Sequence, residues 1–193
     1  MNDRDYPLVD GKIDYNKLSE AVHDWAVRVG WWDSHRDPYE LLQLVVTEVA
    51  EATEGARRSM MDDHLPQYPM EQVELADAII RLVDMAGRYQ WEYIPNKYGY
   101  HRWLVRDKDA TPISTGRMHF AIVSCVVAIG NLVEMDVDNG WSIGYTTTIN
   151  TILRVAELRG YDLTQCILDK VEYNRTREDH KRESRQGEHG KKF

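Results

Sequence analysis

Hydrophobic residues recur along most of the chain at steps of three and four positions, which is the period of an amphipathic α-helix. The pattern predicts a first helix over about 14–30. A second helix is expected over about 38–59, because Asp37 is a suitable N-cap and Pro38 suits the first helical position. A third is expected over about 70–94. The residues that define the apolar faces of these three helices are Leu18, Val22, Trp25, Ala26, Val29, Leu41, Leu42, Val45, Val49, Ala52, Val73, Ala76, Ile80 and Val83.

The second half of the chain is less regular. Residues 95–117 show no clear period and predict a long insertion loop. Within 120–129 only Ser124 is not apolar, which favours a helix buried on nearly every side, with a strand as the alternative. Two further helices are expected over 143–158 and 163–182. Together these elements predict one all-α domain over the whole chain, a four-helix-bundle core with additional helices.

Composition narrows the class of protein. The chain has 193 residues with 42% hydrophobic residues, enough to form a packed core. Its two cysteines, Cys125 and Cys166, form no C-x-x-C pair and cannot provide the disulfide framework of a small secreted domain. No apolar run approaches the ~18 residues of a membrane span, and the acidic start lacks a signal peptide's apolar stretch. We therefore expect a cytoplasmic protein (in the host cytoplasm if the chain is phage-encoded) that does not enter a membrane.

The formal net charge of -8 is unevenly distributed. Residues 40–85 carry 3 basic and 10 acidic side chains, a net of -7, whereas residues 170–193 carry 8 basic and 5 acidic side chains, a net of +3. An acidic chain is poorly suited to coat nucleic acid, so we expect no nucleic-acid partner. The last residues, 183–193, are polar and predict a flexible basic tail.

Two pairs of acidic residues stand at i, i+3 spacing within the acidic block. Glu48 and Glu51 would lie on one face of the second helix, and Glu74 and Asp77 on one face of the third. Two antiparallel helices could point all four carboxylates at one space, where they would raise one another's pKa values unless a cation lay between them. Mg²⁺ is the expected occupant, with Mn²⁺ as a substitute, because both prefer oxygen ligands.

A solvated acidic helix face is the alternative for either pair. Two more acids continue the same spacing, Glu54 and Asp84. Glu54 could join the cation site from the next turn, whereas we expect Asp84 to face solvent.

A second group of polar residues lies on the last predicted helix. Lys170, Asn174 and Arg177 follow one another at steps of four and three, so they share a stripe that suits a phosphate chain. Lys191 and Lys192 could close over that chain. The alternative is a helix C-terminus enriched in cations because they complement the helix dipole.

The acidic motifs resemble a known family. The segments Glu48-Val-Ala-Glu51 and Glu74-Leu-Ala-Asp77, with 22 residues between them, are similar to the E-x-x-E … E-x-x-D signature of MazG-like, all-α nucleoside triphosphate pyrophosphohydrolases. The segment 20–26 with Gly30-Trp31-Trp32 resembles the first helix of phage and bacterial relatives. The segment 170–177 resembles the closing K-x-x-x-N-x-x-R element of the family.

The resemblance implies Mg²⁺-dependent hydrolysis of a nucleoside or deoxynucleoside triphosphate to the monophosphate and pyrophosphate, in nucleotide-pool trimming or house-cleaning, with a purine or dGTP preference in some relatives. Carried over by position, Glu48, Glu51, Glu74 and Asp77 would be metal ligands, with Glu51 and Glu48 as the catalytic residues and Glu51 as the favoured proton acceptor. The substrate-binding set would be Lys170, Asn174, Arg177, Lys191, Lys192, Trp31 and Trp32. The resemblance also implies a homodimer or homotetramer.

The chain departs from the family at its end and in its middle. Eleven residues separate Arg177 from His189, and a single glycine, Gly190, stands where the family's H-G-G-K-K element has two. These departures put the closing roles of His189 and Lys191 in doubt. For the adjacent Trp31 and Trp32, one or both could stack on a base, although we expect core packing for at least one.

Three other functions remain open on the sequence. A dimeric dUTPase would share the scaffold and the carboxylates. A carboxylate-bridged di-iron bundle would need two Glu-x-x-His elements, and only Glu20-Ala-Val-His23 has that form. A non-enzymatic helical interaction or regulatory module is the alternative of another class.

Overall fold

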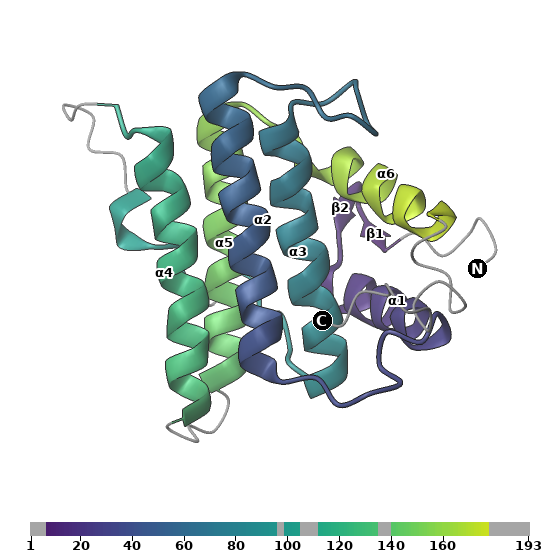
Figure 1. Cartoon of the computed structure of the whole chain (residues 1–193). Helices are drawn as coiled ribbons and strands as arrows, with labels where there is room; N and C mark the ends of the chain where they lie inside the picture. Colours follow the sequence, from purple (N-terminus) through teal and green to yellow (C-terminus); the bar gives the residue numbers. More distant parts are fainter. Residues whose placement is uncertain (1–6, 96–98, 105–111, 135–139, 178–193) are drawn as a thin grey trace.

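The fold is described from a computed structural model, which covers residues 7–95, 99–104, 112–134 and 140–177. Within these residues the protein is all-α, with six α-helices, one 3-10 turn and one small hairpin (Figure 1). The elements are β1 (Leu8–Val9), β2 (Lys12–Ile13), α1 (Tyr15–Arg28), α2 (Pro38–Arg58), α3 (Met70–Tyr89), η1 (Arg102–Leu104), α4 (Thr115–Glu134), α5 (Gly140–Arg159) and α6 (Leu163–Thr176).

The four long helices form a bundle, and the two short ones flank it. α2 packs on α3 and on α4, α4 packs on α5, and α5 packs on α3, so that α2 to α5 enclose one core. α1 and α6 both pack against α3, on the side of the bundle away from α4 (Figure 1). This confirms the predicted all-α bundle with additional helices and places α3 at its centre.

The central helix α3 is buried at nearly every position from Glu71 to Ala86. Leu75, Ile79 and Leu82 are among the largest fully buried side chains, and Tyr145, Ile149 and Ile152 of α5 belong to the same core. Because three helices and α6 surround α3, its polar residues have few ways to reach solvent. Any polar residue on this helix therefore needs a partner or a cavity.

Helix starts follow the capping residues seen in the sequence. Asp37 caps α2, where its carboxylate accepts a hydrogen bond from the Tyr39 backbone N–H at 2.7 Å, and Asp162 caps α6 in the same way through Thr164 at 2.9 Å. At the other end of α2, Ser59 adopts a left-handed conformation with φ 52°. The predicted bounds of the first three helices therefore agree with the structure to within a few residues.

Two bounds of the second half need correction. The expected loop over 95–117 contains the short turn η1, whose Leu104 is fully buried, and it gives way to α4 already at Thr115. The last helix ends at Thr176 rather than at residue 182, and Arg177 is extended. The apolar pattern in the sequence ends at Tyr173, three residues before the end of α6. The tail 183–193 lies outside the described residues.

The hairpin β1–β2 is an element that the pattern analysis missed. Leu8 pairs with Ile13 and Val9 pairs with Lys12, around a turn in which Asp10 and Gly11 both have positive φ. An Asp-Gly dipeptide is the sequence signal of such a tight turn.

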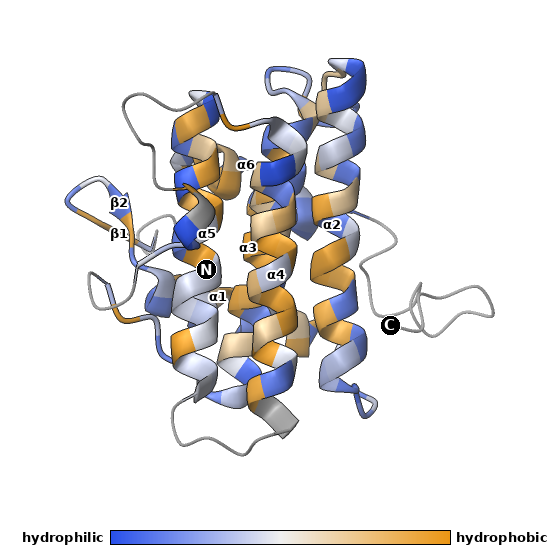
Figure 2. Cartoon of the chain, turned by 90° about the vertical axis from the view of Figure 1, so that its left-hand side faces the viewer, coloured by the Kyte–Doolittle hydropathy of each residue, from blue (hydrophilic) through white to orange (hydrophobic). Residues whose placement is uncertain are grey.

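α4 is less buried than its apolar sequence suggested. Two of its large hydrophobic side chains are exposed, Phe120 by 56% and Val127 by 55%, so the expectation of burial on nearly every side was wrong. Apolar positions run along this helix (Figure 2). The segment Thr115–Leu132 is also long and apolar enough to cross a membrane by length and composition, which corrects the statement that no stretch approaches a span. It packs against α2 and α5, and a core helix of a soluble bundle passes the same test.

Candidate functional site

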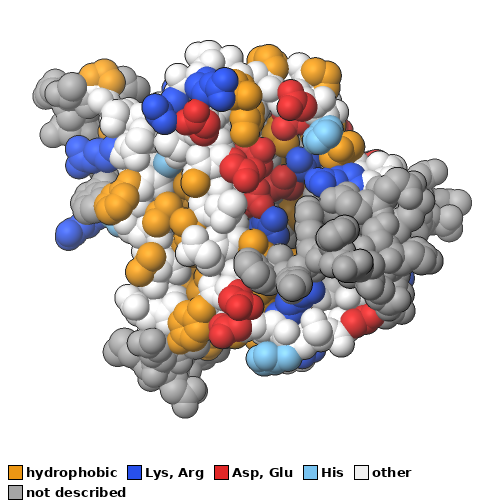
Figure 3. Space-filling model, in the orientation of Figure 1, with side chains coloured by type: hydrophobic (Ala, Val, Ile, Leu, Met, Phe, Trp, Pro, Cys, Tyr) orange, Lys and Arg blue, Asp and Glu red, His pale blue; other side chains and the backbone are white. Residues whose placement is uncertain are grey.

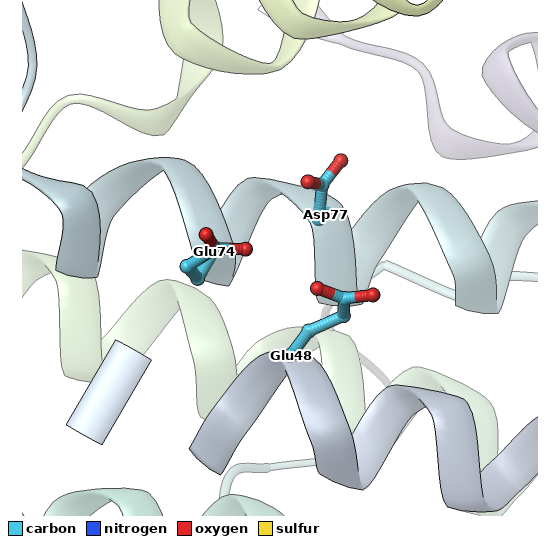
Figure 4. Close-up of side chains that lie close together, drawn as sticks. All are labelled: Glu48, Glu74 and Asp77. Carbon is cyan, nitrogen blue, oxygen red and sulfur yellow. The ribbon is translucent and has the colours of Figure 1, made fainter. Parts of the chain in front are cut away.

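Three carboxylates converge between α2 and α3. Glu48 projects from α2, and Glu74 and Asp77 project from successive turns of α3 (Figure 4). Each offers one oxygen, and these oxygens all lie within 4.8 Å of one another. Glu48 and Glu74 are buried. The i, i+3 spacing on α3 and the antiparallel pairing with α2 therefore place these three acids in one group, which we call the carboxylate cluster.

Two other acids of α2, Glu51 and Glu54, are not members of the carboxylate cluster. Glu51, one turn after Glu48, is exposed and lines the same cavity, but its carboxylate lies outside the three-residue group. Glu54 is half-buried and pairs with Arg57 at 2.8 Å and with Arg58 at 3.8 Å on its own helix. Glu54 therefore does not point into the site.

Basic and amide side chains contact the carboxylate cluster directly. The Lys170 ammonium lies 2.9 Å from Oδ2 of Asp77, and the Asn174 amide donates to Oδ1 of Asp77 at 3.4 Å. Arg81 donates to Glu48 through Nε. In Figure 3, acidic side chains surface over α2 and α3 next to Lys and Arg side chains on the side of α6. The stripe on α6 thus faces the acids in this structure.

The positive charges of these partners do not fully offset the negative charges of the carboxylate cluster. Burial raises the pKa of Glu74, and the negative charges of Asp77 and Glu48 raise it further, to about 9, against the opposing effect of Lys170. Burial also raises the pKa of Asp77, although Lys170 opposes this. Without a bound cation the carboxylate cluster therefore holds a proton at neutral pH.

A cavity of about 400 Å³ opens over the carboxylate cluster. One face of α3 forms its floor, because Glu74, Asp77, Arg81 and Asp84 follow one another at steps of three, four and three. The acids Glu74 and Asp77 lie at one end of this face. Asp84 lies two turns from Asp77, ~10 Å along the helix axis. The cavity therefore extends from a charged end toward the C-terminal end of α3.

The other end of the cavity, at Asp84, is lined by Trp31 and by Met85 of α3. Trp25 of α1 also lines the cavity, and it borders a second, smaller cavity together with Ile80 and Asn174. The Arg36 guanidinium lies 3.8 Å from the ring centroid of Trp31, and its Nε donates to the Trp31 carbonyl at 2.9 Å. Trp31 is therefore held in place by a stacked cation, as is typical of a rigid aromatic wall.

The neighbouring tryptophan has a different environment. Trp32 donates its Nε1–H to Oδ1 of Asp84 at 2.9 Å and packs edge-on against His23 and Tyr89. Trp32 is not part of the cavity lining. The two adjacent tryptophans therefore have different positions. Trp31 lines the cavity, whereas Trp32 packs against Asp84 outside the cavity lining.

The remaining residues expected to bind substrate lie at or beyond the end of α6. Arg177 lines the cavity from the C-cap of α6. Lys191, Lys192 and His189 lie outside the described residues. The structure therefore brings Lys170, Asn174 and Arg177 to the charged end of the cavity.

Several residues of the cavity were not predicted from the sequence, and one was predicted to lie elsewhere. Asp84, expected to face solvent, has a side chain only 13% exposed and lines the cavity. Arg81 continues the spacing of Asp77, which is a signal that could have found it. Trp25 was assigned only to the core. His64 comes from the loop between α2 and α3 and stacks on Tyr173 at 4.9 Å, a contact that no local pattern indicates.

A buried ion pair holds the first turn of α3, just before the carboxylate cluster. Glu71, which is 1% exposed, accepts hydrogen bonds from Arg159 at 2.7 Å and from Tyr161 at 2.6 Å, and its Oε1 lies 3.1 Å from Nε2 of His119. Burial alone raises the pKa of Glu71, but these hydrogen bonds lower it to about 2. Glu71 therefore links α3 to α4 and to the end of α5, one turn before Glu74.

Comparison of the chain with protein-family models, with curated proteins and with solved structures found no match.

Proposed function

We propose that this protein is a divalent-cation-dependent hydrolase that cleaves a nucleoside or deoxynucleoside triphosphate into the monophosphate and pyrophosphate. The observation that carries the proposal is a single cavity with two chemically distinct ends. The charged end contains the carboxylate cluster beside Lys170, and the ring of Trp31 lines the other end, with Trp25 also in the cavity lining. A nucleoside triphosphate has the same division between a charged chain and an aromatic base.

The donor set suits Mg²⁺ or Mn²⁺. All three members of the carboxylate cluster offer oxygen, the ligand that these hard cations prefer. The raised pKa values of Glu74 and Asp77 show that the cluster lacks positive charge, which a cation would supply in place of the proton. Glu48, Glu74 and Asp77 would hold the ion, and Glu51 is placed to join them from the cavity wall.

When bound, the cation would neutralise part of the triphosphate charge and lower the pKa of a water molecule for attack on phosphorus. Glu51 is exposed on the cavity wall one turn from Glu48, so it could accept the proton of that water. Lys170 and Arg177 would bind phosphate oxygens, Lys170 as a point charge and Arg177 through its planar fork.

The aromatic end suits the nucleobase. Trp31 is held by Arg36 on one side and lines the cavity, so a base could stack on it at little cost in side-chain entropy. Trp25 lines the same cavity. This arrangement extends the expected substrate-binding set to Trp25 and removes Trp32 from it.

The experiment is to incubate the protein with each common NTP and dNTP, including dUTP, with MgCl₂ or with EDTA, and to identify the products. We expect pyrophosphate and the monophosphate with Mg²⁺ and no reaction with EDTA. Glu48→Gln should lower kcat at least 100-fold, whereas Glu157→Gln, at an exposed site on α5, should leave it unchanged. Release of orthophosphate would refute the reaction type, activity confined to dUTP would favour the dUTPase alternative, and the absence of hydrolysis would favour an interaction module.

A further inference from the structure

The two carboxylate oxygens of Asp84, at the aromatic end of the cavity, differ in their hydrogen bonds. Oδ1 accepts the indole N–H of Trp32 at 2.9 Å and lies 2.9 Å from Nδ1 of His23. Indole nitrogen can only donate, so Oδ1 is fixed as an acceptor. Among the described residues, none donates a hydrogen bond to Oδ2. Since Asp84 lines the cavity, Oδ2 could accept a hydrogen bond from a ligand bound there.

The position of Asp84 along α3 matches the base end of a bound nucleotide. It lies on the same helix face as Glu74 and Asp77, two turns beyond Asp77. Met85 and Trp31 line the same cavity. A base stacked on Trp31 would therefore present its edge to a wall that contains Asp84. Burial raises the pKa of Asp84, whereas its hydrogen bonds with Trp32 and His23 and the positive charge of Arg81 oppose this shift.

We propose that Asp84 selects the nucleobase, by accepting a hydrogen bond from an amino group on the base edge. This inference rests on the proposed function and names its substrate class, nucleotides of amino-bearing bases. Cytosine and adenine carry such an amino group where uracil and hypoxanthine carry a carbonyl oxygen. A carbonyl placed against Oδ2 would bring two acceptors together in a partly dry cavity, leaving both without a hydrogen bond.

The hydrogen bonds to Oδ1 give a distinctive expectation for Asp84→Asn. Trp32 and His23 would keep the amide oxygen of the new side chain in the position of Oδ1. The amide NH₂ would then occupy the position of Oδ2 and present a donor to the cavity. The preference should therefore invert toward carbonyl-bearing bases, rather than merely weaken.

The test compares kcat/KM for two matched pairs of substrates, dCTP with dUTP and dATP with dITP. For the natural protein we expect a preference of about 10- to 100-fold for the amino member of the pair that is accepted. For Asp84→Asn we expect dUTP or dITP to be preferred. Asp24→Asn, the same change at an exposed site on α1 outside the cavity, should keep the natural preference.

Equilibrium binding of non-hydrolysable analogues of the same four nucleotides, followed by tryptophan fluorescence, provides a readout that does not depend on turnover. Equal kcat/KM and equal affinity within both pairs for the natural protein would overturn the inference, even if Asp84→Asn does not fold. An unchanged preference in a folded Asp84→Asn would overturn it as well. Because hydrolysis of all four substrates at equal rates would leave the proposed function intact, the two proposals fail separately.

Discussion

Replacing Glu74 by glutamine should stabilise the cation-free protein while removing most of its response to Mg²⁺. Glu74 is buried and lies within 4.8 Å, oxygen to oxygen, of Glu48 and Asp77. Glutamine has nearly the same shape and no charge. The substitution therefore removes the repulsion that the carboxylate cluster suffers without a cation, together with one of the three expected ligands.

The magnitude follows from the pKa of Glu74, which is about 9 in the folded protein against an ordinary value of 4.5. A raised folded pKa means that stability is fully present below pH 4.5 and is lost as pH rises from 4.5 to about 9. Each pH unit in this window costs about 1.4 kcal/mol, so the cost at pH 7 reaches about 3 kcal/mol. This is an upper bound, because Glu48 and Asp77 share the proton. The stability advantage of Glu74→Gln should thus grow with pH.

Urea denaturation followed by circular dichroism at 222 nm, at pH 5 and pH 8, measures the effect. In EDTA the advantage of Glu74→Gln over the natural protein should increase by up to about 4 kcal/mol between these pH values. Mg²⁺ at 100 times its Kd should stabilise the natural protein by about 2.7 kcal/mol and the variant by much less. Glu157→Gln, exposed on α5, should behave as the natural protein does.

Two results would refute this reasoning about Glu74. A parallel loss of stability with pH in both proteins would mean that the carboxylate cluster holds no proton at Glu74. Full Mg²⁺ stabilisation of the variant would mean that Glu74 is not a ligand.

Three further predictions concern the surroundings of the site. The pKa of Glu71 is lowered from 4.5 to about 2, so its ionised form should contribute about 3 kcal/mol to the free energy of unfolding above pH 4.5. This contribution is lost as pH falls from 4.5 to about 2. Glu71→Gln should remove this acid-sensitive part of the free energy of unfolding. Gly87→Ala should cost about 1–3 kcal/mol in thermal unfolding, because the new methyl group would lie 2.4 Å from Cβ of His23. Lys170→Met should cost about 3 kcal/mol and weaken triphosphate binding in a fluorescence titration, since Asp77 would lose its buried partner.

Each of these variants has a matched control or a contrary outcome. Gly116→Ala, where no atom lies within 4 Å of the added methyl group, should not destabilise the protein. If Glu71→Gln keeps the same stability profile between pH 2 and 4.5, Glu71 is not the titrating group. For Lys170→Met, unchanged nucleotide affinity would show that Lys170 neutralises Asp77 without touching the substrate.

Local sequence signals predicted the helices well wherever a cap or a clear period was present. Asp37-Pro38 and Asp162 mark helix starts because a carboxylate can accept the free backbone N–H groups of the first turn, and this requires no tertiary contact. The burial of α4 was predicted poorly. Phe120 and Val127 look like core residues in composition, yet only the packing of α4 on α2 and α5 decides which side of the helix is covered.

The candidate site was predictable in part, because the spacing of residues along one helix is a local property of the sequence. The spacing of Glu74 and Asp77 determines that they share a face of α3, and the pairing of α2 with α3 then brings Glu48 to them. Spacing could not tell that Asp84, on the same face, is covered by His23 of α1 and by Trp32 of the segment that follows α1.

By itself, the sequence determined the all-α class, the starts of α2 and α6 and the acidic face of α3, because these depend on contacts between residues a few positions apart. Only the tertiary structure decided which charges are neutralised and which residues line the cavity. It set Lys170 against Asp77, separated Trp31 from Trp32 and turned Asp84 inward. Burial and long-range partners set these properties, since the cost of desolvating a charge depends on everything packed around it.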